Sequence, residues 1–209
     1  MNFLKQTFAM LFILLSTQAY AESIVGHEYK LVKPPQQTSS GDKIEVLDFF
    51  FYGCGHCYSM HPNLTAWEKT LPKDVDLVLV PTVFNPSWEA MANTYYALEV
   101  LGLNHKLHND LYEIWNVQKK ALTTEADIID VLSKRGVDSK KFSDAYHSFG
   151  VKSKVTRSKQ MSQAYGIRGT PTVIIDGKYL ITGLQPADSI NVMNALIDKV
   201  RKERAAGKR

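Results

Sequence analysis

Residues 43–62 read KIEVLDFFFYGCGHCYSMHP, and this stretch decides the fold class. Its first half, Lys43–Phe51, is rich in aliphatic and aromatic side chains, which is typical of a buried strand. Its second half contains Cys54 and Cys57, after which apolar residues recur at helical spacing. These residues are Met60, Leu64 and Trp67. The sequence therefore predicts a strand that runs directly into a helix, with the two cysteines at the junction.

The rest of the chain predicts an α/β domain with a helical interruption. Strands are expected at four further places: Glu28–Val32, Val75–Val83, Thr172–Asp176 and Lys178–Thr182. The last two are joined at Asp176-Gly177, a strong hairpin signal. Residues 86–149 show helical spacing, a longer helix follows to about Tyr165, and an amphipathic helix ends the chain. Some 60 helical residues thus interrupt a sheet domain.

Composition excludes several classes of protein. The 209 residues are 44% hydrophobic and carry a formal net charge of +4. This balance excludes collagen-like and charge-driven disordered chains, and the length supports a core without crosslinks. The charge is too small to indicate nucleic acid as a partner.

Residues 1–21 have the pattern of a secretory signal peptide. Lys5 precedes the apolar run Phe8–Leu15, and Ala19-Tyr20-Ala21 gives the small-x-small pattern of a cleavage site. The apolar run is far shorter than the roughly 20 residues that span a bilayer. We therefore expect cleavage after about Ala21 and export to an oxidising compartment, where disulfides persist.

The Cys-x-x-Cys pair fits three kinds of site: a structural crosslink, a metal site or a redox pair. A structural crosslink over so short a loop gives only about 2 kcal/mol by the loop-entropy estimate. A structural zinc site has four ligands, and the chain holds no second cysteine pair. Copper(I) bound by Cys54 and Cys57, with His61 or Met60 nearby, stays open as a metal alternative.

A redox role has physical support from the position of the pair. A helix that begins at Cys54 places its sulfur near unpaired backbone N–H groups and the positive end of the helix dipole. His56 adds a further donor or positive charge. Both effects lower the pKa of Cys54, and a stable thiolate is a good leaving group in disulfide exchange. Cys57, one turn into the helix, is expected to be more buried.

The segment Gly169-Thr170-Pro171 precedes a predicted strand and supports this interpretation. A cis bond between Thr170 and Pro171 turns the chain sharply and leaves the backbone of Thr170 free to pair with an extended peptide.

The motif FFFYGCGHCYSMHP, the Gly-Thr-Pro segment and the helical block together resemble the thioredoxin fold, and more closely the DsbA family of exported thiol:disulfide oxidoreductases. The resemblance implies a thioredoxin-like domain (22–85 and 151–209) with an inserted helical domain (86–150). It implies Cys54 as nucleophile, Cys57 as resolving cysteine and Pro171 as the cis-proline. Gly55 and Thr170 then lie beside the redox pair and contact substrate.

The family resemblance also implies the partners and the compartment. It implies a periplasmic enzyme that oxidises dithiols in unfolded, newly exported polypeptides and is reoxidised by a DsbB-like membrane oxidase. The redox-active disulfide serves in place of a cofactor or a metal. Because only about 20 residues precede the first core strand, a separate dimerisation domain has no room, which favours a monomer and an oxidase. A disulfide isomerase or reductase, and a non-catalytic copper(I) module, are the alternatives.

Two features depart from the family pattern. The dipeptide between the cysteines is Gly55-His56, where well-known DsbA proteins have Pro-His, so the redox potential does not carry over. Relatives also often pair a buried acid, here Asp48, with a lysine on the next strand, whereas Leu77-Val78-Leu79 contains none. Asp48 is either a buried proton relay to Cys57 or a strand acid whose side chain reaches solvent.

Overall fold

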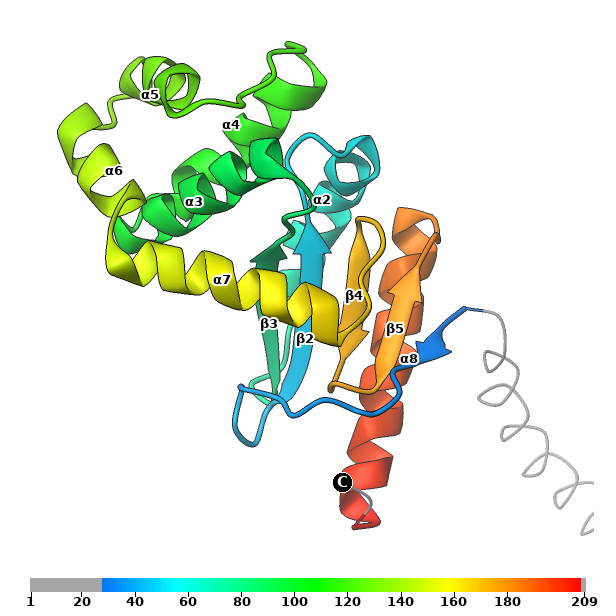
Figure 1. The fold of residues 1–209 in the computed structure, drawn as a ribbon. Helices are drawn as coiled ribbons and strands as arrows, with labels where there is room; N and C mark the ends of the chain where they lie inside the picture. The colour runs from blue at the N-terminus through cyan, green and yellow to red at the C-terminus, as the bar shows by residue number, and fades with distance from the viewer. Residues whose placement is uncertain (1–27, 208–209) are drawn as a thin grey trace, which may run out of the picture.

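The computed structural model describes residues 28–207, and its centre is a five-stranded sheet (Figure 1). The strands are β1 (Lys30–Leu31), β2 (Ile44–Phe50), β3 (Val75–Pro81), β4 (Thr172–Ile175) and β5 (Tyr179–Thr182). Their spatial order is β1-β5-β4-β2-β3, in which β2 and β3 are parallel and the other pairs antiparallel. This is the thioredoxin-like arrangement expected from the sequence.

Local sequence signals explain where these strands begin and end. All seven residues of β2 are buried, since the strand has neighbours on both sides and helices on both faces. The predicted hairpin joins β4 to β5, and its Asp176 and Gly177 have φ of 52° and 67°. Positive φ at both positions matches the turn that an Asp-Gly pair favours.

Seven helices are described within residues 28–207: α2 (Gly55–Glu68), α3 (Pro86–Val100), α4 (Asn104–Asn116), α5 (Glu125–Ser133), α6 (Ser139–Tyr146), α7 (Phe149–Ala164) and α8 (Pro186–Ala205). The side chains of Thr124 and Asp138 cap α5 and α6 by accepting from backbone N–H groups three residues later. The helix predicted to about Tyr165 is α7.

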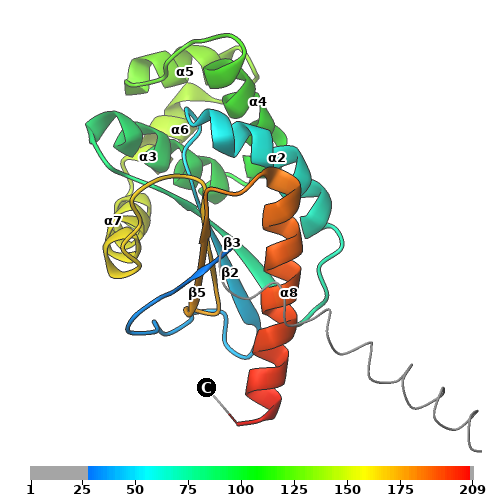
Figure 2. The ribbon, with the colours of Figure 1, turned by 90° about the vertical axis from the view of Figure 1, so that its right-hand side faces the viewer.

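The helices form layers on the sheet. Figure 2 shows α8 on one face and α7 on the other, with α2 beside α8. Buried residues of α2 and α8 form one apolar cluster with β2, β3, β4 and β5, and residues at the end of α7 join a second cluster on the opposite face. Both faces of the sheet are therefore covered.

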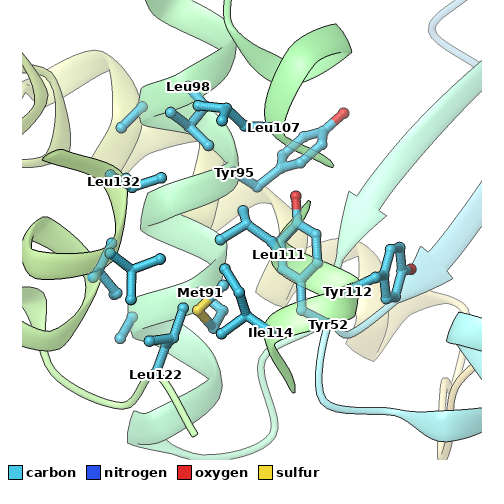
Figure 3. Packing of buried hydrophobic residues seen from close by; sticks show 14 of the residues in the cluster. Tyr52, Met91, Tyr95, Leu98, Leu107, Leu111, Tyr112, Ile114, Leu122 and Leu132 are labelled. Carbon is cyan, nitrogen blue, oxygen red and sulfur yellow. The ribbon is translucent and has the colours of Figure 1, made fainter. Parts of the chain in front are cut away.

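Helices α3 to α6 lie at the end of the sheet where β2 meets α2 (Figure 1). Their apolar side chains form a cluster that includes Met91, Leu111 and Leu132 (Figure 3). Tyr52 and Tyr112 lie on the side of this cluster nearest the sheet, and Cys57 belongs to the same cluster. The helical block therefore packs directly against residues 53–57, which we call the redox turn.

The expected signal peptide, residues 1–21, lies outside the described residues. Within residues 28–207, no helix combines the length and apolar character required to cross a bilayer.

Candidate active site

Cys54 lies at the N-terminus of α2, where the chain leaves β2. It is the N-cap residue, with extended backbone (φ −87°, ψ 114°), and its backbone N–H donates to Phe51 O at 3.0 Å. Cys54 is half-buried and Cys57, one turn later, is 3% exposed. Both are free thiols in this structure, so the site is described in its reduced form.

The surroundings of Cys54 favour its thiolate. Its pKa is lowered from 9.0 to about 5, chiefly by a hydrogen bond from the Cys57 side chain. The Thr170 side chain and the backbone N–H groups of Cys57 and His56 lower it further, and these donors outweigh partial burial. His56 lowers the pKa of Cys54 through its backbone N–H, and its side chain is exposed. The helix N-terminus thus acts as predicted, through its N–H groups.

Cys57 has the opposite electrostatics. Burial raises the pKa of its thiol strongly, and the nearby Cys54 and Asp48 raise it further. The two cysteines therefore divide into an accessible thiolate and a buried thiol.

Residues 169–171 meet the cysteine pair from the other half of the chain. The Thr170–Pro171 bond is cis, as expected. The Thr170 carbonyl oxygen lies 3.1 Å from Cys54 Sγ and accepts from it in the thiol form. The fold thus joins two motifs that lie more than 100 positions apart in the sequence.

Asp48 is buried beneath the pair, which settles its position. It is 5% exposed and lies on β2 opposite Leu79 of β3 and Val173 of β4. Its Oδ1 has no hydrogen-bond partner among the described residues. Burial, with a smaller contribution from the Cys54 charge, raises the pKa of Asp48 from 3.8 to about 7. The carboxyl therefore changes protonation near neutral pH.

A small cavity of about 50 Å³ lies between Asp48 and Cys57 and is large enough to hold water. Its wall includes two histidines that the sequence did not assign to the redox site, His61 and His108. Their ring centroids lie 5.0 Å apart, and His108 Nδ1 is 2.7 Å from Tyr52 Oη. Burial lowers the pKa of His108 from 6.5 to about 3, so its ring is neutral at pH 7. His61 lies four residues after Cys57 and therefore on the same side of α2. This spacing is the sequence signal that could have placed His61 near the cysteine pair.

The redox turn is held by α4, a contact that the sequence did not reveal. Asn116 Nδ2 donates to Tyr52 O at 2.8 Å, just before the turn, and Tyr58 Oη donates to Glu113 Oε1 at 2.7 Å, just after it. Position 53 requires glycine because the neighbouring side chains are too close for a Cβ, which would lie 2.5 Å from Phe51 and 2.7 Å from Trp115. The helical block therefore fixes the geometry of the cysteine-bearing loop.

Gly55 and the exposed ring of His56 lie on the open side of the pair. Within residues 28–207, no group of three or more His, Cys, Asp or Glu side chains is arranged to hold a metal ion. The chemistry that the arrangement provides is an accessible thiolate, a buried partner thiol and a buried carboxyl that titrates near neutrality.

Comparisons with known proteins agree with this geometry. A family model described as a DSBA-like thioredoxin domain matches residues 45–193. The "Thiol:disulfide interchange protein DsbA" of Pseudomonas aeruginosa is 35% identical over 187 residues, which cover 88% of this chain and 87% of that protein. The protein of the same name from Burkholderia cepacia is 35% identical over 86% of each chain.

Solved structures give the same result for the fold. The crystal structure of Pseudomonas aeruginosa DsbA superposes with a TM-score of 0.80 at 34% identity and covers 87% of this chain and 95% of its own. The oxidoreductase NmDsbA1 from Neisseria meningitidis has a TM-score of 0.79 at 26% identity, over 86% and 95% of the two chains. The likeness covers both the sheet and the helical block.

Proposed function

The chain belongs to the DsbA-like thioredoxin family and is a thiol:disulfide oxidoreductase, and from that premise we propose that it introduces disulfide bonds into unfolded, newly exported polypeptides of the periplasm. The observation that carries the proposal is the asymmetry of the pair. Cys54 is a stabilised, accessible thiolate beside the Thr170 backbone, whereas Cys57 is a buried thiol. A pair that favours its reduced form in this way accepts electrons readily from other thiols.

The first step of the proposed reaction forms a mixed disulfide at Cys54. A substrate thiolate attacks Cys54 Sγ of the oxidised enzyme, the Cys54–Cys57 bond breaks, and Cys57 leaves as a thiolate. Because Cys57 is buried and its thiolate is unfavourable there, it takes a proton as it leaves. Asp48, protonated in part at pH 7, supplies that proton through water in the adjoining cavity.

The second step releases the oxidised substrate. A second substrate thiolate attacks the substrate sulfur of the mixed disulfide, and Cys54 leaves as the thiolate that its hydrogen bonds stabilise. Two substrate thiols have then become one disulfide, and the enzyme pair has taken up two electrons. Throughout, the backbone of Thr170 pairs with the substrate beside cis-Pro171, with Gly55 and His56 on the open side.

A DsbB-like membrane oxidase restores the disulfide in this proposal. In that direction the Cys57 thiol attacks the mixed disulfide formed with the oxidase and returns its proton to Asp48. The enzyme acts as a monomer after removal of residues 1–21 and holds no cofactor besides its own disulfide. Residues 22–85 and 151–209 form the thioredoxin-like domain, and residues 86–150 form the inserted domain that positions the redox turn through Asn116.

The test is oxidation of a reduced, unfolded substrate protein by the oxidised enzyme, followed by mass spectrometry of its disulfides. We expect rapid transfer of one disulfide per enzyme and no transfer with Cys54→Ser or Cys57→Ser, since neither variant can form the Cys54–Cys57 disulfide. The Cys57→Ser variant, first loaded at Cys54 as a mixed disulfide with glutathione, should exchange glutathione for the substrate thiol and give a substrate mixed disulfide at Cys54. Reshuffling of scrambled disulfides without net oxidation would favour an isomerase. Tight copper(I) binding without any disulfide transfer would favour the metal-binding alternative.

A further inference from the structure

A surface groove lies next to the cis-proline loop and has no part in the chemistry described so far. We call it the α7 groove; its volume is about 380 Å³. It is lined by residues of the loop after β3, of α7 and of the loop after α7: Val83, Phe84, Lys159, Ser162, Gln163, Gly166, Ile167 and Arg168. The last two residues stand immediately before Gly169-Thr170-Pro171. The groove is thus continuous in the chain with the segment that contacts Cys54.

The backbone N–H groups between the groove and Cys54 are available for pairing. The backbone–backbone hydrogen bonds of residues 28–207 include none from Arg168, Gly169 or Thr170, and β4 begins only at Thr172. An extended peptide that pairs with Thr170 therefore continues alongside Arg168. Residues two apart in an extended chain lie on the same side, about 6.6 Å from each other. A substrate residue two positions from the reacting cysteine accordingly faces Arg168.

The groove carries two cationic side chains, of which only one is paired with a carboxylate. Lys159 Nζ is paired with Glu89 at 2.9 Å. Arg168 is exposed and has no ion-pair or hydrogen-bond partner among the described residues. A guanidinium is always charged and binds carboxylates in a planar, two-bonded geometry. The groove thus presents an unpaired guanidinium two residues before Thr170 in the chain.

Aromatic side chains link the groove to the cysteine pair. Phe84 is 44% exposed and lies 5.0 Å from Trp88, which stacks on Phe51 at 3.8 Å between ring centroids. Cys54 packs against the same apolar cluster as Trp88. Phe84 thus gives the groove an apolar side, beside which charges are screened less than in water.

We propose that the α7 groove is a recognition subsite for a carboxylate side chain placed two residues from the reacting cysteine of an extended polypeptide, with Arg168 as its partner. The inference rests on the proposed function, because it concerns the polypeptide that forms the mixed disulfide at Cys54. It assigns to the enzyme a preference among cysteines, for those followed or preceded at that spacing by Asp or Glu. Arg168 is here a specificity-determining residue and takes no part in electron or proton transfer.

The test compares single-cysteine peptides that differ only in one residue, Asp or Asn, at the second position after or before the cysteine. Rates of mixed-disulfide formation are measured with the oxidised enzyme and with its Arg168→Gln, Arg168→Glu and Lys152→Gln variants. Lys152 is an exposed cation elsewhere on α7 and serves as the matched control. Each rate is divided by the rate of the same protein with β-mercaptoethanol, a neutral small thiol, which removes differences in Cys54 reactivity.

The quantity compared is the ratio of the rate with the Asp peptide to the rate with the Asn peptide. We expect this ratio to be about two- to five-fold higher for the wild-type enzyme and for Lys152→Gln than for Arg168→Gln. Arg168→Glu should reverse the preference, and added salt should reduce it. The position at which Asp acts, after or before the cysteine, reports antiparallel or parallel pairing with residues 168–170. Equal Asp-to-Asn ratios in wild type and Arg168→Gln at both positions would overturn the inference. Failure with β-mercaptoethanol as well would instead count against the proposed function.

Discussion

Protonation of Cys54 should remove much of the extra stability of the reduced protein. The pKa of Cys54 is lowered to about 5 in the folded, reduced chain, against about 8.5 for an ordinary cysteine. A lowered pKa stabilises the folded state above the unfolded value and loses that effect as the pH falls through the folded value. At pH 7 the two-unit distance from the folded pKa corresponds to at most about 2.7 kcal/mol. Because Cys54 is half-buried, solvent screening reduces this to about 1–2 kcal/mol.

The same energy appears as a change of redox potential. The oxidised protein has no thiolate at position 54, so the stabilisation belongs to the reduced form alone. At about 30 mV for each 1.4 kcal/mol of a two-electron couple, the thiolate makes the pair some 20–40 mV more oxidising at pH 7 than it would be with an ordinary Cys54. The effect should vanish below about pH 5, where the thiol is protonated in both states.

The assay is urea unfolding of the reduced and the oxidised protein at about pH 4 and about pH 7, followed by circular dichroism. Between the two pH values, the free energy of unfolding of the reduced form should fall by about 1–2 kcal/mol relative to the oxidised form. The Cys54→Ser variant is the control, since its unfolding lacks this pH-dependent difference. An unchanged gap between the two redox forms, or a thiolate absorbance midpoint near pH 8.5, would refute the reasoning.

Three further predictions concern the surroundings of Cys54. Replacement of Asp48 by Asn should slow the attack of a small thiol on the oxidised pair and remove the inflection near pH 7 from the pH profile of the rate. Stopped-flow measurements across pH 5–9 test this. A profile that keeps the inflection would assign the proton to another group. Replacement of Cys57 by Ala removes the largest stabilising hydrogen bond, so the pKa of Cys54 should rise toward its ordinary value in a thiolate absorbance titration, and an unchanged midpoint would mean that the helix N–H groups suffice. Replacement of Gly53 by Ala forces Phe51 or Trp115 to move and should cost about 1–3 kcal/mol in urea unfolding, whereas the open position Gly150, changed to Ala as control, should cost little.

The parts of the molecule that were predictable from sequence are those governed by near neighbours in the chain. The helix start at Cys54, the Asp176-Gly177 turn and the caps at Thr124 and Asp138 all depend on interactions within about four residues. The association of Cys54 with Thr170 was predictable only because two motifs were recognised together, since 116 positions separate them.

The rest of the site depends on packing between distant segments. Tyr52 meets His108 across 56 positions and Asn116 across 64, and no local pattern signals either contact. The environment of Asp48 was undecided in the sequence because a strand acid faces solvent or the interior according to what covers it. The sheet order, with β2 in the interior and α2 over that face, places Asp48 under Cys57. His56 was expected to act through its ring, but its hydrogen bond to Cys54 comes from the backbone N–H, which any residue except proline would supply at that position.

The two edge strands of the sheet, β1 and β3, bear on aggregation, because the proposed partners of this protein are unfolded chains. An exposed strand margin is a template on which such chains add and aggregate. Here β1 has only two residues and is followed by Lys33-Pro34, while β3 ends at Pro81, has a half-buried middle and lies against α3 and α7. Proline offers no N–H and the flanking helices restrict access. The protein can thus react with unfolded polypeptides through its cysteines while its sheet edges offer those polypeptides few backbone groups on which to aggregate.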